Sequence, residues 1–417
     1  MFVHGYLPSQ LTEVVLVPIL KDKTKLTSDV NNYRPIALAT VISKALEHIL
    51  LKRCEAHLAS HYLQFGFKRE HSTDLCLFAF KEIVNYYTSN GGPMYVCFLD
   101  ASKAFDRVNH FKLIQKLIDR KLPLYIVRLI YFWYRNQMFC VRWGNLTSDW
   151  FSVTNGVRQG GVLSPHLFNI YIDDLIRNLS NSGIGCNICG ISANNLSYAD
   201  DMSLLSPSIK GLQRLLDICE VYGKEHDIIY NPDKTECMVF RGKKVKLVRI
   251  PNVHLNGKSL KFVRNHIQLG HNINCDMTDN DDIERQRRAF CVRANMLLRQ
   301  CKNCSINVKK LLFSAYCRNI YCSHLWVNYH QKVINKLKVM YNNVWRRLLG
   351  VPPFSSASGM FVSNGIMSLG EVIRQNIYNF RCRMEKSTNN LVYAICESDR
   401  NFHSKAFRLW RKQLYTF

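Results

Sequence analysis

The chain has 417 residues, of which 47% are hydrophobic and 12% aromatic, so it can build a large packed core and is not intrinsically disordered. It has no apolar run of the roughly 18 residues that a membrane helix needs, and no signal peptide, which argues against a membrane-spanning or secreted class and favours an intracellular location, in the nucleus or cytoplasm. Its 56 Lys and Arg residues outnumber 31 Asp and Glu residues, and the net charge of +25 favours a polyanionic partner.

Most of this charge lies in the C-terminal part. Residues 241–417 hold 31 basic and 9 acidic residues, a net of +22, whereas residues 1–240 hold 25 and 22, a net of +3. A basic face of this kind usually meets phosphate, so nucleic acid is the favoured partner. The alternatives are a solvated basic surface or a patch for anionic membranes. We expect the sixteen cysteines to be reduced and mostly buried.

Predicted helices and strands alternate through the N-terminal third. Helices are indicated by apolar residues three and four apart, and buried strands by short, continuous apolar runs. In chain order these elements are a strand at 11–18, a helix from 42 to about 61, a helix at 75–86 capped by Ser72 and Thr73, a strand at 94–99, and helices at 113–118 and 124–134. The strand at 94–99 is apolar throughout and ends on Asp100.

The middle of the chain continues the mixed pattern up to Gly270. The predicted elements are a strand pair within 138–154, a helix capped by Ser164 with Pro165 at its first position, a hairpin at 195–205 that turns at Ala199-Asp200, a helix from 208 to about 225, and strands at 235–240, 253–255 and 260–263, the last two flanking an Asn256-Gly257 turn. After Gly270 the pattern becomes almost wholly helical and basic. We therefore predict two domains, 1–270 and 271–417.

Three aspartates are the strongest chemical signal. Asp100 ends a buried strand, where an ionised carboxylate is costly unless it has a partner, and Asp200-Asp201 lie in a hairpin turn, where their charges repel. A divalent cation removes both penalties, and carboxylates favour Mg²⁺ or Mn²⁺ over zinc. Phosphoryl-transfer sites of this kind hold two ions about 3.5–4 Å apart. The alternative for the Asp-Asp pair alone is a solvated turn.

Seven ordered segments resemble the successive blocks of a reverse transcriptase, in the spelling of the non-LTR (LINE-type) retrotransposon branch. They are YRPIALATVISKALE (33–47), QFGFKREHST (64–73), FLDASKAFDRV (98–108), NGVRQGGVLSP (155–165), YADD (198–201), NPDKTECMVF (231–240) and QLGHNI (268–273). The resemblance covers roughly residues 1–275, and the helical remainder resembles the thumb region less specifically. It implies an α+β, right-hand fold with fingers, a palm built on an antiparallel sheet, and a helical thumb.

The resemblance also implies an activity. The reaction is RNA-directed DNA synthesis, in which a primer 3′-hydroxyl attacks a dNTP and pyrophosphate leaves. The cofactor is a pair of Mg²⁺ ions, with Mn²⁺ possible, and the partners are an RNA template, a DNA primer and dNTPs. No protein partner is predicted. Neither an endonuclease upstream nor a CCHC knuckle downstream is recognisable, so we expect a fragment of a retrotransposon polyprotein.

Residue roles follow from the same resemblance. Asp100 and Asp200 match the metal-binding aspartates, Asp201 their neighbour, and the Ala101 carbonyl a backbone metal ligand. Phe105 matches the ring that blocks a ribose 2′-hydroxyl, and Gln159, Gly160 and Gly161 match the loop beside the nucleotide. Arg34 and Lys68 match residues that contact the triphosphate, and Lys234 matches a lysine that protonates pyrophosphate. Leu269 and Gly270 match the primer-grip turn.

Several of these roles have simpler alternatives. Phe105 could be ordinary core, and Lys234 a solvated surface lysine. Lys68 stands where the family more often has arginine, so it keeps the charge but loses the bidentate fork. We expect Asp106 to be structural and in a helical turn, and Asp173-Asp174 to be a pair on a helix face.

The basic C-terminal helices allow two interpretations. Arginines at 285, 287, 288, 293 and 299 could grip a template–primer backbone. The interleaved aromatic residues are expected to be mainly core: Phe313, Tyr316, Tyr321, Trp326, Tyr329 and Trp345. A zinc site from Cys301, Cys304, Cys317, Cys322 and His324 is disfavoured, because its spacing fits no standard zinc motif.

Three other functions compete with a retrotransposon polymerase. A catalytically silent or co-opted nucleic-acid-binding relic would keep the fold without the chemistry, although intact Asp100, Asp200, Phe105 and Gln159 argue against simple decay. An RNA-dependent RNA polymerase is disfavoured by Phe105, since that enzyme must admit the 2′-hydroxyl. A group II intron maturase or a telomerase would share the core motifs.

Overall fold

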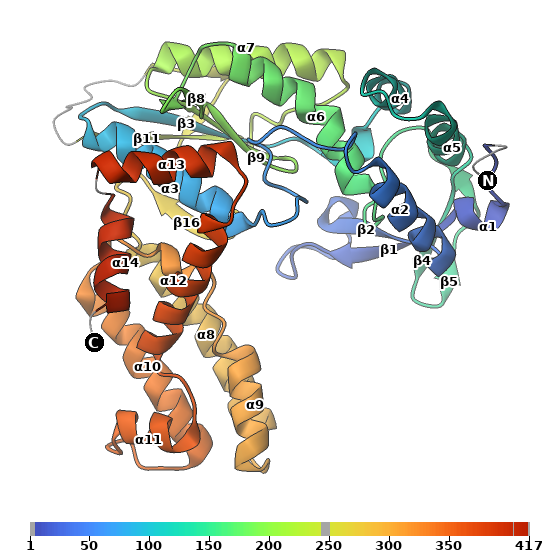
Figure 1. Ribbon diagram of the computed structural model, residues 1–417. Helices are drawn as coiled ribbons and strands as arrows, with labels where there is room; N and C mark the ends of the chain where they lie inside the picture. The colour runs from blue at the N-terminus through green and yellow to red at the C-terminus, as the bar shows by residue number, and fades with distance from the viewer. Residues whose placement is uncertain (1–4, 243–250, 403, 416–417) are drawn as a thin grey trace.

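The computed structural model describes residues 5–242, 251–402 and 404–415. A central body holds a twisted sheet between helices, a smaller N-terminal part lies to one side of it, and a helical arm projects away from it (Figure 1). In the described part of the chain, no helix is both long enough and apolar enough to cross a bilayer.

The central sheet has the strand order β14-β11-β3-β10-β9. Its strands are β3 (Met94–Leu99), β9 (Asn195–Tyr198), β10 (Asp201–Ser206), β11 (Glu236–Phe240) and β14 (Lys261–Phe262). All six residues of β3 are buried, and β3 pairs antiparallel with β10 on one side and β11 on the other. The predicted buried strand and the predicted β9–β10 hairpin are therefore both confirmed.

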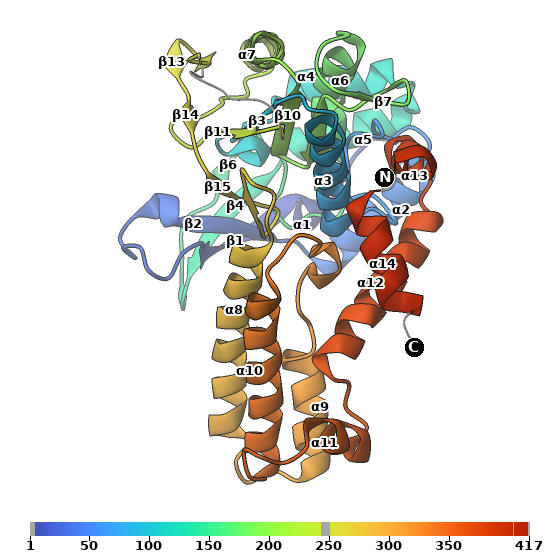
Figure 2. The ribbon, with the colours of Figure 1, turned by 90° about the vertical axis from the view of Figure 1, so that its left-hand side faces the viewer.

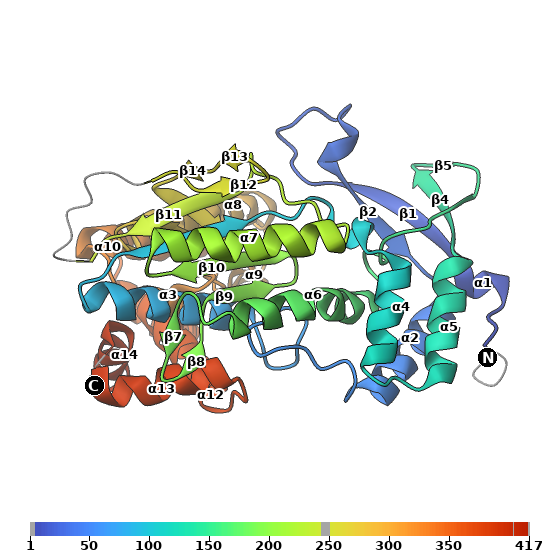
Figure 3. The same cartoon turned by 90° about the horizontal axis from the view of Figure 1, so that it is seen from above.

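Helices cover both faces of this sheet. Helices α6 (Ser164–Asn181) and α7 (Ile209–Glu225) lie over one face, and α3 (Thr73–Ser89) lies under the other (Figures 1 and 3). Ser208 caps α7 by accepting the Gly211 N–H, as its position predicts. Ser164, by contrast, is the first residue of α6 and not its cap; it is 1% exposed, and its hydroxyl makes no capping bond.

The N-terminal part carries a second sheet, in which β1 lies between β2 and β4. Its elements are α1 (Ser9–Thr12), β1 (Glu13–Leu20), β2 (Tyr33–Leu38) after the 3₁₀ turn η1 (Val30–Asn32), α2 (Val41–Cys54), α4 (His110–Asp119), α5 (Leu124–Arg135), β4 (Met138–Trp143), β5 (Leu146–Thr147) and β6 (Phe151–Ser152). The predicted end of β1 at Pro18 is wrong. The strand continues because β4 pairs only with residues 13–16, so the missing Pro18 N–H costs no bond there.

Two further boundaries differ from prediction. Helix α2 ends at Cys54 and not near residue 61, because a turn follows in which Leu58 stays buried and prolongs the apolar pattern. The Asn256-Gly257 turn joins β12 (His254–Leu255) to β13 (Lys258–Ser259), and not to a strand at 260–263. A two-residue turn closes on its immediate neighbours, which leaves residues 261–262 free to pair in parallel with β11 as β14.

The helical region begins later than predicted. Residues after Gly270 first form β16 (His271–Asn274), which pairs antiparallel with β15 (Asn265–Gln268), and the first long helix starts at Asn280. The short hairpin of β7 (Asn187–Ile188) and β8 (Ile191–Ser192) was also not predicted. Both hairpins are too short and too polar to show a strand period in the sequence.

The helical arm consists of α8 (Asn280–Gln300), α9 (Ile306–Tyr316), α10 (Gln331–Leu349) and α11 (Ala357–Asn364), with the 3₁₀ turn η3 (Ser323–Leu325) between α9 and α10 (Figure 2). It has its own core, in which Phe290, Phe313, Tyr341 and Trp345 are fully buried. Trp326 is buried as well, as expected for the aromatic residues. Tyr321 and Tyr329 are half-buried, and Tyr316 is 46% exposed and does not belong to the core.

The last three helices return to the central body. They are α12 (Leu369–Glu385), α13 (Asn390–Phe402) and α14 (Lys405–Tyr415). Phe78 of α3 stacks on Trp410 with ring centroids 5.7 Å apart and packs edge-on against Phe380 at 5.5 Å. An ion pair between Arg383 and Asp74, 2.7 Å long, adds to the contact between α12 and α3.

The sixteen cysteines all lie in the described part and are free thiols, and ten of them are buried, as expected. The candidate zinc ligands do not share one place. Cys301 and Cys317 belong to the core of the arm, whereas Cys322 belongs to the core of the central body, and His324 lies 3.3 Å from the Asp74 carboxylate.

Candidate active site

The three aspartates meet at one end of the central sheet. Asp100 directly follows β3, and Asp201 opens β10, the neighbouring strand, in which Met202 is paired with Leu99. Asp200 lies in the turn between β9 and β10. Two adjacent antiparallel strands thus deliver the carboxylates that were singled out from the sequence to the same edge.

The charges of these carboxylates act on one another. Burial raises the pKa of Asp200, and the neighbouring Asp100 charge adds to that rise. Desolvation, followed by repulsion from Asp200 and Asp100, raises the pKa of Asp201 to about 6, although its side chain remains open to water. The repulsive part of these shifts is what a bound cation would remove.

The oxygen atoms of the site suit a hard cation. Asp100 Oδ2 is buried and has no hydrogen-bond partner in the described structure. Within residues 5–242, 251–402 and 404–415, no group of three or more His, Cys, Asp or Glu side chains is placed so that it could hold a metal ion. Carboxylate oxygens are ligands that magnesium prefers, and it usually takes only one or two carboxylates from a protein.

A buried glutamine, which sequence reasoning missed, holds the turn that carries Asp200. Ala199 has a φ of +57°, an uncommon value for a residue with a side chain. Gln64 is fully buried, and its Oε1 accepts the N–H groups of Ala199, at 2.9 Å, and Gly66, at 2.8 Å. A Cβ at Gly66 would lie 2.4 Å from the Ala199 nitrogen, so only glycine permits this approach.

The backbone around Asp100 is held from the segment before β11. Thr235 Oγ1 accepts the Asp100 N–H at 3.2 Å, and the Asn231 N–H donates to the Asp100 carbonyl at 2.9 Å. Ala101 is bridged to Tyr230. Lys234 is exposed and lies next to Thr235, so its backbone sits close to the aspartate edge. Thr235 was not singled out from the sequence.

The Gln-Gly-Gly loop is fixed by a buried ion pair that the sequence did not reveal. Arg158 and Glu47 are 3.0 Å apart, with side chains only 2% and 1% exposed. Glu47 Oε2 also accepts the N–H groups of Val162 and, at 3.2 Å, Leu163. Arg158 lies over the ring of Trp133, 4.5 Å from its centroid.

The same loop packs closely on β2. Gln159 accepts the Ala37 N–H at 2.7 Å through its backbone carbonyl, and its side chain donates to Asp106 Oδ1 at 2.7 Å. Gly160 has a φ of +107°, and a Cβ there would lie 3.0 Å from the Ala37 carbonyl oxygen. Asp106 lies in the 3₁₀ turn η2 (Ala104–Arg107), as expected, but it also orients Gln159.

Phe105, in η2, is half-buried in a small group of rings. It stacks on Phe168 with centroids 4.4 Å apart and planes 15° from parallel, and Phe67 lies edge-on at 6.5 Å. The Phe105 carbonyl accepts the Val157 N–H at 2.8 Å. The ring is therefore fixed between α6 and the Gln159 loop, at the border of the core.

The two cationic candidates are placed differently. Arg34 of β2 is exposed, and its charge acts on both Asp200 and Asp201. Lys68 is turned inward, where Nζ donates to the carbonyls of Ser60 at 2.9 Å and His61 at 2.7 Å, and burial lowers its pKa to about 8. Lys68 is thus not presented to the aspartates in this structure.

The acidic pair in α6 is structural, as expected, but it is not simply a pair on a helix face. Asp173 is fully buried and accepts hydrogen bonds from the His61 N–H, Arg120 and Arg177. Asp174 pairs with Lys116. The pair ties α6 to α4 and to the loop before α3.

A family model described as reverse transcriptase (RNA-dependent DNA polymerase) matches residues 19–272, more than half of the chain. The chain belongs to the reverse transcriptase family. The matched range contains all three aspartates and the Gln159 loop, and the family assignment together with the mixed sheet-and-helix architecture confirms the α+β, right-hand polymerase fold.

Named relatives narrow the branch. The RNA-directed DNA polymerase from mobile element jockey of Drosophila funebris is 25% identical in an alignment 412 residues long, which covers 93% of this chain and 43% of that protein. The Pol polyprotein from retrotransposable element R2 of Nasonia vitripennis is 30% identical over 249 residues, 58% of this chain and 24% of that protein. These relatives confirm a reverse transcriptase of the non-LTR type.

The chain spans less than half the length of these relatives. Among solved structures, apo telomerase from Candida tropicalis is similar over 97% of this chain and 69% of that chain, with a TM-score of 0.48 and 11% identity.

Proposed function

We propose that the chain is an RNA-directed DNA polymerase that extends a primer 3′-hydroxyl with dNTPs on an RNA template. The observation that supports this proposal most is the meeting of Asp100 with Asp200 and Asp201 at one sheet edge, with their charges coupled and one carboxylate oxygen unpartnered. A relic that had lost catalysis would have no reason to keep this unfavourable arrangement.

In this proposal Asp100, Asp200 and the Ala101 carbonyl hold divalent cations, Mg²⁺ or Mn²⁺, with Asp201 as a supporting charge. When bound, such ions lower the pKa of the attacking hydroxyl and stabilise the charge of the leaving pyrophosphate. The protein itself orients the groups. Thr235 Oγ1 accepts the Asp100 N–H at the end of β3, and Gln64 Oε1 accepts the Ala199 N–H in the β9–β10 turn, so both carboxylates are positioned before substrate arrives.

Other side chains would act on the nucleotide. Gln159 and Gly160 would line the nucleotide-binding site, and Arg34 would bind the triphosphate. Lys234 would donate a proton to pyrophosphate. Lys68 would have to leave the carbonyls of residues 60 and 61 to reach phosphate, so its contribution depends on movement of its loop.

We assign the fingers, palm and thumb of a right-hand polymerase to three parts of the structure. The N-terminal sheet would form the fingers, the central body the palm, and the arm the thumb, with the domain change near residue 270. The chain would act inside the cell, on an RNA template and a DNA primer. The +22 charge of residues 241–417 supports a nucleic-acid partner for the arm.

The direct test is a primer-extension assay with the purified 417-residue chain, an RNA template and a labelled DNA primer. We expect template-directed extension with dNTPs and Mg²⁺, and none when EDTA replaces the metal. If the chain extends no primer on an RNA template with either Mg²⁺ or Mn²⁺, the result would contradict the proposal and favour a catalytically silent relic.

Sugar selection by Phe105 can be tested separately. In this proposal the Phe105 ring lies against the sugar and excludes a ribose 2′-hydroxyl, so Phe105→Val should reduce the preference for dNTPs over rNTPs by about 10- to 200-fold. The measurement is kcat/KM for one dNTP and the matching rNTP. Phe105→Tyr keeps the ring and should keep the preference; equal selectivity in all three proteins would show that Phe105 only packs.

A further inference from the structure

A two-residue turn, Leu269–Gly270, lies where the central body meets the helical arm. It joins β15 to β16, and both residues have positive φ, +45° and +75°, as the tightest hairpin turns require. Gln268 is paired with His271 across the hairpin, directly behind the turn. The hairpin pairing alone closes the turn. Contacts from other segments therefore serve to fix the position of the turn.

Two side chains from outside the hairpin bind the two carbonyls of this turn. The Tyr321 hydroxyl donates to the Leu269 carbonyl at 2.7 Å, and Arg285 Nη2 donates to the Gly270 carbonyl. The Tyr321 ring also packs against Gly270, where a Cβ would lie 3.5 Å from a ring carbon. Both carbonyls of an otherwise solvent-facing turn are thus held by protein.

Tyr321 connects the turn to the first residue of α3. Its hydroxyl lies 2.8 Å from Thr73 Oγ1. A carbonyl can only accept, so the single Tyr321 proton goes to Leu269, and Thr73 must donate to the Tyr321 oxygen. The turn is therefore tied through Tyr321 to the central body.

Arg285 connects the turn to the arm. The side chain is fixed by Asp282, one turn earlier on α8, with Nε at 3.1 Å and Nη2 at 2.7 Å from Oδ1. Asp282 is fully buried and also accepts the Asn272 N–H of β16 at 3.1 Å and the Trp326 indole N–H at 2.9 Å. Arg285 is thus engaged in the joint and not presented as a free cation for a nucleic-acid backbone.

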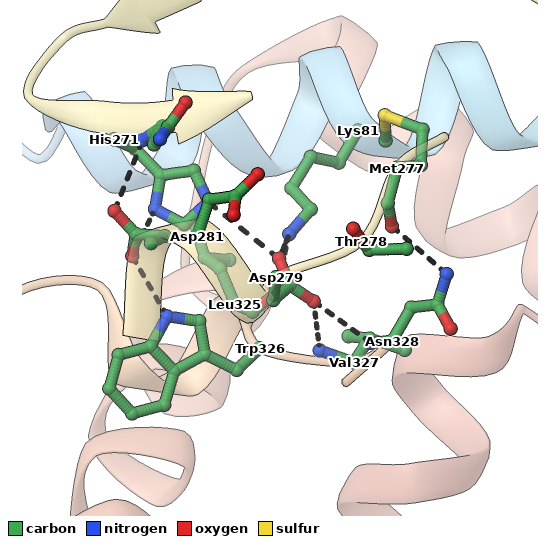
Figure 4. A network of polar contacts seen from close by, with 12 residues as sticks. Lys81, His271, Met277, Thr278, Asp279, Asp281, Leu325, Trp326, Val327 and Asn328 are labelled. Atoms are coloured by element: carbon green, nitrogen blue, oxygen red, sulfur yellow. Dashed lines mark hydrogen bonds and ion pairs between the residues drawn. The ribbon is translucent and has the colours of Figure 1, made fainter. Parts of the chain in front are cut away.

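A second buried pair makes this joint rigid. Lys81 of α3 donates to Asp279, at the start of α8, at 2.5 Å and to the Leu325 carbonyl at 2.7 Å, while Asp279 Oδ2 accepts the N–H groups of Val327 and Asn328 (Figure 4). His271 lies between the carboxylates of Asp279 and Asp282, with Nε2 3.8 Å from the first and Nδ1 3.1 Å from the second. Helix α3, the β15–β16 hairpin and the arm are therefore joined by one polar network.

We propose that Tyr321 and Arg285 are positioning residues for the primer 3′ end, which act by fixing the Leu269–Gly270 turn. This inference rests on the proposed function, in which that turn contacts the primer. Neither side chain touches a reacting atom. A turn that shifts by a fraction of an ångström would misplace the 3′-hydroxyl and slow the chemical step. It should not loosen the duplex, which in the proposed function is gripped by the basic arm through separate backbone contacts.

The test is a pre-steady-state burst of single-nucleotide incorporation by Tyr321→Phe and Arg285→Lys. The burst amplitude counts correctly folded, primer-bound enzyme, and the burst rate reports the chemical step. We expect the rate to fall about three- to tenfold, the effect of losing one such hydrogen bond, with an amplitude unchanged from wild type. Tyr393→Phe, which alters a tyrosine 64% exposed on α13, serves as the matched control and should keep both values.

Thr73 provides a conservative rescue. Thr73→Val removes the hydroxyl that orients Tyr321 and should lower the burst rate in the same direction, whereas Thr73→Ser should restore it. A lower amplitude with a wild-type rate in Tyr321→Phe would show a purely structural role and overturn the inference, as would a wild-type rate and amplitude. A wild-type protein without any incorporation would instead overturn the proposed function itself.

Discussion

Asp200→Ala is expected to abolish primer extension, with a loss of roughly a thousandfold or more in kcat/KM for dNTP. Asp200 shares its sheet edge with Asp100, and in the proposed function the removal of its carboxylate would deprive the cations of a ligand. The measurement is single-nucleotide incorporation on an RNA template at saturating Mg²⁺.

Stability distinguishes this loss of chemistry from misfolding. Because the metal-free carboxylates repel, Asp200→Ala should unfold at the same temperature as wild type in EDTA, or at a higher one. Asp217→Asn, which alters an exposed aspartate on α7, should leave both extension and stability unchanged. If the kcat/KM of Asp200→Ala is within tenfold of the wild-type value, Asp200 does not hold a catalytic cation.

Glu47→Ala is expected to lower the free energy of unfolding by about 3–5 kcal/mol. The substitution leaves Arg158 buried without its partner and deprives the N–H groups of Val162 and Leu163 of their acceptor. Because the same segment carries Gln159, the loss should also appear as weaker dNTP binding at temperatures where the protein is still folded. Denaturant unfolding gives the first quantity, and the KM for dNTP gives the second.

Two variants bracket this result. Glu55→Ala, at an exposed site just after α2, should change the free energy of unfolding by less than about 0.5 kcal/mol. The double variant Glu47→Leu with Arg158→Met removes both charges and should be more stable than Glu47→Ala alone. If Glu47→Ala matches Glu55→Ala, the buried pair does not stabilise the loop.

The sequence predicted those parts of the site that local pattern encodes. A run of six apolar residues before Asp100 predicts a buried strand, and the alternating residues on both sides of Ala199-Asp200 predict a hairpin turn. Ser208 at the start of an amphipathic run identified its helix for the same reason. These features depend on neighbours in the chain, so composition and spacing suffice.

The supporting contacts could not be predicted, because they join residues distant in sequence. Gln64 binds Ala199 across 135 positions, and Glu47 binds Val162 across 115. All four residues lie in the segments that resemble the family, yet nothing in the spacing shows which side chain turns inward. Lys68 illustrates the converse: its charge suggested a phosphate contact, whereas its surroundings direct it to backbone carbonyls.

Helix α14 can pack on α3 only after almost the whole chain has been synthesised. Trp410 stacks on Phe78, which precedes it by 332 positions (410 minus 78), and its indole N–H reaches the His324 carbonyl at 2.8 Å. Contacts so far apart form late during synthesis, whereas the arm closes its own core from residues much nearer in sequence. On the ribosome, the arm can therefore be complete while one face of α3 is still uncovered. Shortening the chain before Trp410 would leave the part of that face around Phe78 that α14 covers exposed, and would favour aggregation.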